Sequence, residues 1–164
     1  MCDQLQAKLP AGVRRALSTR RPVCGPLFSL LCLTLVTGCG PTPPYATTPI
    51  SGKVTYEDGS LIPGEQVTVT FVPQTPPIDP RTYPRPAGVV VNAADGTFGN
   101  FTTDTYGDGV TLGPAKVVVQ SSKADGLPTG AVPAEYSSAE QTPLKVEVTS
   151  GHAPYEIKVP KPAQ

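Results

Sequence analysis

Apolar and polar residues alternate with a period of two along several short stretches of the chain. In residues 50–56, ISGKVTY, every second position is apolar or glycine. In residues 66–72, QVTVTFV, valines and Phe71 alternate with threonines. Successive side chains of a β-strand point to opposite faces of its sheet, so this pattern predicts strands with one buried face.

Turn-forming residues separate these stretches at regular intervals. EDGS at 57–60, Asp95-Gly96 and SGHAP at 150–154 each predict a tight turn. The stretches at 87–103, 115–121, 144–151 and 155–161 complete the set of predicted strands and hairpins. Residues 73–86 are rich in proline, which cannot donate to a sheet ladder, and predict a long surface loop.

The expected fold is therefore all-β. About seven short strands and no amphipathic helix favour an antiparallel Greek-key β-sandwich, of the immunoglobulin-like kind, over residues 50–160. Residues 161–164 are expected to form a short tail. Pro and Gly make up 37 of the 164 residues, close to the level at which disorder becomes an alternative, but the valines cluster into short runs, which favours strands separated by turns.

Charge is distributed unevenly along the chain. Residues 1–38 hold five of the 13 basic residues and one of the 13 acidic ones, so they carry +4 and the remainder carries −4. A mildly acidic remainder without a basic cluster is unsuited to neutralising phosphates, and we expect no nucleic-acid binding.

The first 38 residues have the layout of a signal peptide. Basic residues end at Arg20 and Arg21, and ten mostly apolar residues, LFSLLCLTLV, follow at 27–36. As a helix they would span about 15 Å, roughly half of a bilayer core, so they are too short for a stable membrane helix. We expect residues 1–38 to be a cleaved signal peptide.

Four cysteines, Cys2, Cys24, Cys32 and Cys39, all lie in this first quarter of the chain, at spacings that match no common zinc site. LVTGC resembles the lipobox of bacterial lipoproteins, with Gly38 directly before the cysteine. That resemblance implies cleavage between Gly38 and Cys39 and attachment of acyl chains, such as palmitate, at Cys39. The alternative is an ordinary cleaved signal whose cysteine is incidental.

Residues 39–49 are then expected to be a lipidated cysteine followed by a linker rich in Pro and Thr. Extended, such a linker would hold the domain some 30 Å from the lipid surface. The expected location is the cell envelope, on the outer or inner membrane, facing the periplasm or the exterior.

Three segments resemble the carboxypeptidase regulatory-like domain of small planctomycete lipoproteins, a transthyretin-like β-sandwich. They are SGKVTYEDGSLIPGEQVTVTFVP, NAADGTF and GDGVTLGPAKVVVQ. The residues that match in kind and order are Gly52, Val54, Gly59, Gly64, Val67, Phe71, Asp95, Gly96 and Phe98. The resemblance implies a fold and no particular activity.

Candidate chemistry is sparse. His152 is the single histidine, in a predicted turn, and no Ser or Cys motif supplies a nucleophile for it. Asp104 and Asp108 in DTYGDG admit two interpretations, a calcium site or an ordinary polar turn. Loop tyrosines that would stack on sugars are Tyr45, Tyr83 and Tyr106.

These observations predict a non-enzymatic, membrane-anchored lipoprotein of the cell envelope, with no catalytic residues, no metal site and no cofactor. Its anchor is Cys39, and it acts as a structural or protein-interaction module through strand edges or Pro-rich loops. The alternative is a module that binds carbohydrate or cell-wall polysaccharide.

Overall fold

A computed structural model describes residues 43–151 and 154–162 of the chain. The predicted signal peptide, the lipidation site Cys39 with its neighbour Gly38, and His152 lie outside the described residues. No helix in the described part of the chain is long and apolar enough to span a membrane.

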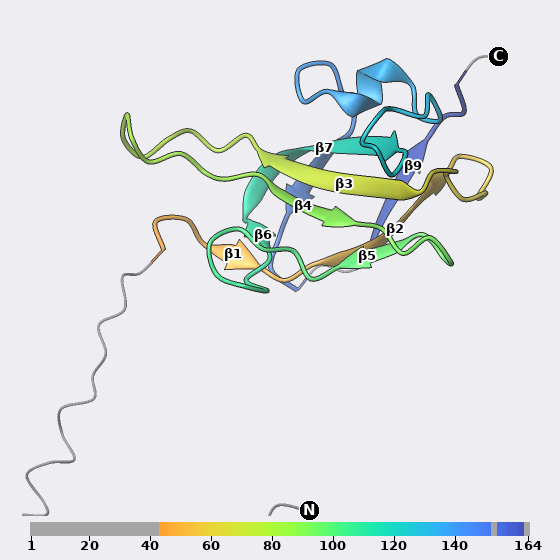
Figure 1. The fold of residues 1–164 in the computed structure, drawn as a ribbon. Coiled ribbons are helices and arrows are strands. Elements are labelled where there is room, and N and C mark those ends of the chain that lie inside the picture. The colour runs from red at the N-terminus through yellow and green to blue at the C-terminus, as the bar shows by residue number, and fades with distance from the viewer. Residues whose placement is uncertain (1–42, 152–153, 163–164) are drawn as a thin grey trace, which may run out of the picture. The chain divides into compact units, whose positions relative to one another are not determined.

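The described residues form an all-β fold of nine strands, two of which are only two residues long, and one 3-10 turn (Figure 1). The strands are β1 Thr47–Thr48, β2 Ser51–Tyr56, β3 Gln66–Pro73, β4 Ala87–Val90, β5 Thr97–Gly99, β6 Val110–Thr111, β7 Gly113–Ser122, β8 Lys145–Val148 and β9 Tyr155–Val159, with the 3-10 turn η1 at Ala134–Ser137. The predicted all-β class is confirmed.

The strands form a four-stranded sheet ordered β4-β3-β7-β8, a three-stranded sheet ordered β5-β2-β9 and the short pair β1-β6. Pairing is antiparallel with one exception, because β2 and β9 run parallel. The expectation of purely antiparallel pairing was wrong at this point. A parallel pair needs a long connection between its strands, and the strands between β2 and β9 provide it.

One hydrophobic core joins the two larger sheets. Phe71 of β3 packs edge-on against Phe101 with ring centroids 5.2 Å apart, and against Tyr155 of β9 at 6.1 Å. Burial alternates along β3 and along β9, as the period-two pattern predicts. Two sheets that share one core form a sandwich-like arrangement.

Gly52 shows why a glycine stands in β2. It pairs with Tyr155 of β9 and with Phe98 of β5. A Cβ atom at this position would overlap the Tyr155 carbonyl oxygen and the Phe98 ring. The absence of a side chain therefore lets three strands and an aromatic ring meet at one point.

The expected linker ends earlier than predicted. Thr47 and Thr48 form β1 and pair with Thr111 and Val110 of β6. Tyr45 is buried, with 9% of its surface exposed. The expectation that residues up to 49 form a solvated tether was wrong for residues 45–49, because hydrogen bonds to β6 override the extended tendency of a Pro- and Thr-rich segment.

Residues 74–86, which we call the arm, connect β3 to β4 and extend beyond the sheets (Figure 1). The arm is the predicted Pro-rich loop. Its tip is a turn in which the Thr82 N–H bonds the Asp79 carbonyl at 3.2 Å and the Arg81 N–H bonds the Asp79 carboxylate at 2.7 Å. Pro80 takes the second position of this turn, where its fixed φ is suitable.

Candidate functional site

A groove of about 640 Å³ lies where the start of the described chain meets the arm. We call it the arm groove. It is lined by residues 43–45 on one side, residues 81–86 of the arm on another, and residues 103–105 with Thr111 below. The groove therefore brings together three segments that are far apart in the sequence.

Tyr45 holds the arm against the start of the domain. Its hydroxyl accepts a hydrogen bond from the Ile78 N–H at 2.9 Å and donates one to the Thr82 carbonyl at 2.8 Å. Both partners lie at the base of the tip turn. The arm and the N-terminal segment thus form one structural unit.

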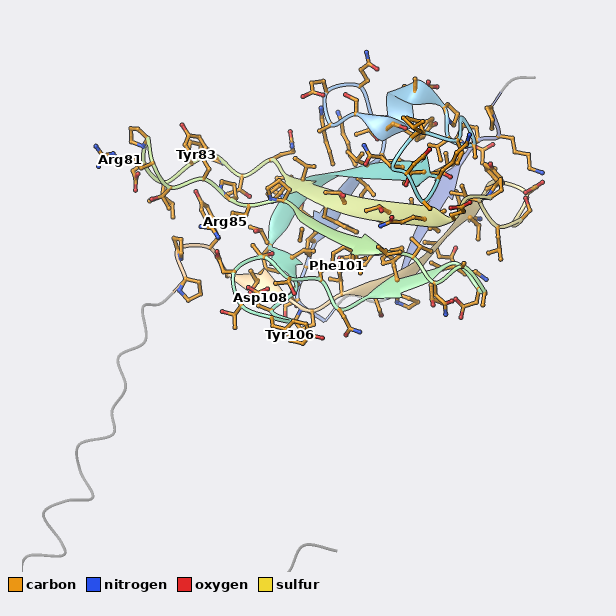
Figure 2. The ribbon with its side chains drawn as sticks, viewed as in Figure 1. Arg81, Tyr83, Arg85, Phe101, Tyr106 and Asp108 are labelled. Carbon is orange, nitrogen blue, oxygen red and sulfur yellow. The ribbon has the colours of Figure 1, made fainter. Side chains whose placement is uncertain are left out.

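Three side chains of the arm face solvent. Ile78 and Tyr83 are 61% and 60% exposed, which is high for large apolar side chains. The Arg81 guanidinium forms no hydrogen bond or ion pair with any described residue. Figure 2 shows Arg81 at the tip of the arm, with Tyr83 and Arg85 further along it. The arm therefore presents apolar surface beside a guanidinium that forms no ion pair within the described part of the chain.

Arg85 and Asp104 tie the arm to the loop at 102–109. The Arg85 Nη1 lies 3.0 Å from the Asp104 Oδ1, and the Asp104 side chain is the less exposed of the two. An exposed pair of this kind contributes at most about 1 kcal/mol. The pair links two of the segments that line the arm groove.

Asp108 organises the loop at 102–109. Its carboxylate accepts backbone N–H bonds from Thr103 at 2.7 Å, from Asp104 at 2.9 Å and from Thr105 at 3.0 Å. Desolvation raises the pKa of the Asp108 carboxyl, but these three bonds together outweigh it and hold the pKa below its ordinary value.

The loop geometry bears on the two interpretations of Asp104 and Asp108. Asp108 accepts bonds from its own loop, and Asp104 is paired with Arg85. Among residues 43–151 and 154–162, no three His, Cys, Asp or Glu side chains gather closely enough to hold a metal ion. The arrangement is that of a carboxylate-capped polar turn.

The three loop tyrosines have different surroundings. Tyr45 is buried and hydrogen-bonded, so its ring is not offered to a sugar. Tyr106 is 92% exposed but does not line the arm groove. Tyr83 alone of the three is both exposed and part of the groove lining.

Arg81 and Arg85 were not predicted as site residues. They flank Tyr83 in the segment RTYPR, at a spacing of two. That spacing places side chains on one side of an extended segment, but Arg81 lies in the tip turn and Arg85 pairs with Asp104. Their different roles therefore depend on the tertiary structure.

A second feature is the outer edge of β8. Pro114 of β7 lies opposite Glu147, has no N–H, and its carbonyl accepts the Gln74 N–H at 2.8 Å on the side away from β8. In an antiparallel pair the hydrogen-bonded and non-bonded positions alternate. The backbone groups of Lys145 and Glu147 therefore point away from β7, to the open edge.

A groove of about 450 Å³ lies over the neighbouring β7–β8 pair, lined by Gln74, residues 114–116 and residues 145–147. The Glu147 carbonyl is already bonded to the Tyr155 hydroxyl at 3.2 Å. The remaining outward groups of β8 can receive a further strand.

Comparison of the chain with models of protein families, with curated proteins and with solved structures finds no match.

Proposed function

We propose that this chain is a non-enzymatic lipoprotein of the cell envelope, anchored through acylated Cys39, that binds a partner protein. The LVTGC sequence supports the anchor. The open edge of β8 is the observation that supports the partner, because outward N–H and C=O groups at the edge of a sheet favour addition of an extended peptide.

An added strand would bond the Lys145 N–H and carbonyl and the Glu147 N–H. The Lys145 and Glu147 side chains are exposed, whereas Val146 and Val148 turn toward the core. Backbone bonds would give affinity, and the exposed side chains of Lys145 and Glu147 would select among partners.

We also propose that the domain is a transthyretin-like, Greek-key sandwich of the carboxypeptidase regulatory-like kind. The supporting observations are the two sheets around one core and the turn at Asp95-Gly96, where Gly96 has φ +77° and the Thr97 N–H bonds the Asp95 carboxylate. The crowded position of Gly52 fits the same pattern.

Photo-crosslinking in intact cells of the native organism tests the partner. A benzophenone amino acid is placed at Lys145 in the full chain, with Asp125 in an exposed loop as the control position. We expect a discrete protein adduct from position 145 and none from 125, identified by mass spectrometry. Equal patterns from the two positions would refute binding at the β8 edge.

Two substitutions at Lys145 distinguish the contribution of its backbone N–H to partner binding from that of its side-chain charge. Lys145→Pro removes the outward N–H together with the lysine charge, whereas Lys145→Thr removes the charge and keeps that N–H. We expect the proline variant to lose the partner in a pull-down and the threonine variant to retain it. In the same cells, Cys39→Ser should move the protein from the membrane to the soluble fraction.

Polysaccharide binding is the second candidate, favoured by the exposed ring of Tyr83 in the arm groove. It predicts retention of the protein on isolated cell wall and loss of that retention in Tyr83→Ala. Tyr106→Ala is the matched control, because that ring is exposed outside the groove.

A further inference from the structure

We propose that the arm is a second membrane contact, with Ile78, Arg81 and Tyr83 seated among lipid headgroups. The inference rests on the proposed anchor at Cys39. It goes beyond that anchor by assigning which end of the domain touches the bilayer and which side chains meet the lipid.

Few residues separate Cys39 from the start of the described domain. Cys39 precedes Pro43 by four residues, and Pro43 and Pro44 already line the arm groove. Four residues span at most about 14 Å when fully extended. An acylated Cys39 would therefore hold the arm groove within about 14 Å of the lipid surface, rather than the 30 Å that a free linker to residue 49 would allow.

The exposed side chains of the arm have the chemistry of residues found at membrane interfaces. Tyrosine is enriched at membrane interfaces, where its ring lies at headgroup depth and its hydroxyl stays hydrated. Tyr83 and Ile78 offer such apolar surface, and more than half of each residue is exposed. The unpaired Arg81 guanidinium has the planar donor geometry that binds a phosphate diester.

The charges near these residues are balanced locally. Asp104 neutralises Arg85 at 3.0 Å. Hydrogen bonds from the Thr82 side chain and from the Arg81 backbone N–H lower the pKa of the Asp79 carboxyl, so this group stays ionised. The tip turn thus carries one cation, Arg81, and one anion, Asp79, and the Arg81 guanidinium is available to the phosphate of a lipid headgroup.

Hydrogen bonds hold the arm in a fixed position against the start of the described domain. Tyr45 bonds both Ile78 and Thr82, so the arm is held in place by the residue that ends the tether. Because the arm is already ordered, membrane contact costs little further conformational entropy. The anchor and the arm then act as two linked contacts, which strengthens the attachment beyond either contact alone.

The chain has no tryptophan, so a single introduced tryptophan reports its own surroundings. Tyr83→Trp places it on the arm. Leu127→Trp is the matched control, because Leu127 is 59% exposed against 60% for Tyr83 and lies in the loop after β7, away from the arm. Both full-length proteins are purified from membranes with their lipid and reconstituted into vesicles of equal parts phosphatidylethanolamine and phosphatidylglycerol.

We expect the Tyr83→Trp emission to shift to the blue on reconstitution and to lose intensity when the vesicle lipids carry bromine near the headgroup. Emission from Leu127→Trp should change in neither respect. Adding Arg81→Gln to Tyr83→Trp should reduce the loss of intensity. Emission that is equally unshifted and unquenched in both variants would overturn the inference.

The anchor is followed separately by the mass of the protein and its flotation with vesicles. If the protein carries no acyl group and does not float, the anchor and the arm contact both fail. If it floats but Tyr83→Trp is unquenched, only the arm contact fails. A Tyr83→Trp response to cell-wall polysaccharide in place of lipid would also overturn the inference and assign the arm groove to polysaccharide.

Discussion

The hydroxyl of Tyr45 accepts a hydrogen bond from the backbone N–H of Ile78 at 2.9 Å, across 33 residues of sequence. This contact joins the residue at the end of the tether to the tip of the Pro-rich arm. The groove between the two segments, and the short distance from Cys39 that we infer for the arm, both depend on it.

Tyr45→Phe removes that hydroxyl and leaves the Ile78 N–H and the Thr82 carbonyl without this partner. Each such hydrogen bond contributes about 1 kcal/mol net, so we expect the free energy of unfolding to fall by about 1–2 kcal/mol. Urea denaturation followed by circular dichroism measures it.

Tyr83→Phe is the control for this change. Tyr83 is exposed, and its hydroxyl makes no hydrogen bond with the described residues. We expect a change within about 0.5 kcal/mol. Faster proteolysis of the arm should accompany Tyr45→Phe alone, and equal cleavage of both variants would contradict a specific role for Tyr45.

Gly109 and Gly107 test whether β1 is part of the fold. Both have positive φ, +97° and +76°. A Cβ atom at Gly109 would overlap the Thr48 carbonyl, whereas a Cβ atom at Gly107 meets nothing within 4 Å. Gly107→Ala should cost about 1–2 kcal/mol for the left-handed backbone, and Gly109→Ala about 1–3 kcal/mol more for the overlap.

The measurement is the midpoint of thermal unfolding of the two alanine variants. Equal midpoints would mean that residues 47–49 do not pack against the loop at 102–109, and that the tether is longer than the structure indicates.

Thr111 and Thr142 are both 3% exposed but differ in hydrogen bonding. The Thr142 hydroxyl donates to the Val117 carbonyl at 2.7 Å, while the Thr111 hydroxyl has no partner among the described residues. Removing an unsatisfied buried hydroxyl relieves a desolvation cost, whereas removing a bonded one leaves its partner unpaired.

We expect Thr142→Val to destabilise the domain by about 1–3 kcal/mol and Thr111→Val to leave it unchanged or stabilise it by about 1 kcal/mol. Urea denaturation of both variants checks this. A loss in Thr111→Val as large as that in Thr142→Val would indicate a hydrogen-bond partner for Thr111, such as a bound water molecule.

The Asp108 carboxyl makes stability depend on pH. Its pKa is lower in the folded state than its ordinary value, because the three backbone N–H bonds outweigh the desolvation that raises it. The carboxylate therefore stabilises the fold fully above the ordinary pKa, and this contribution is lost as the pH falls below about 4.

Asp108→Asn isolates this contribution, since the amide has a single acceptor oxygen and does not titrate. The difference in thermal midpoint between the native protein and Asp108→Asn should be constant from about pH 5 to pH 8 and should shrink below about pH 4. A difference that stays constant into acid would show that the capping bonds do not depend on charge.

Several local features could be predicted because their causes lie within a few residues. The alternation in QVTVTFV indicates which side chains of β3 are buried, and Phe71 is 1% exposed as that pattern requires. Asp95-Gly96 predicts its own turn, because Gly96 supplies the positive φ and Asp95 accepts the Thr97 N–H two residues on. Proline excludes the arm from a sheet interior.

The candidate site was less predictable. Composition assigned Tyr45 to a flexible linker, yet its ring is buried and its hydroxyl bonded to the arm. One interpretation of Asp104 and Asp108 was a shared calcium site. In the structure Asp104 pairs with Arg85, and Asp108 accepts hydrogen bonds from the backbone of its own loop. Tyr45 and Asp104 bond to residues that are distant in the sequence, and the residues next to them in the chain do not indicate these contacts.

The sequence by itself determined the all-β class, the buried faces of the strands and the turns, since these follow from periods of two residues and from the φ preferences of Gly, Pro and Asp. Only the tertiary structure decided that β2 pairs in parallel with β9, that β1 belongs to the fold, and that Tyr45 holds the arm. The physical reason is that such pairings join residues far apart in the chain, where their free energy depends on how all the strands pack together.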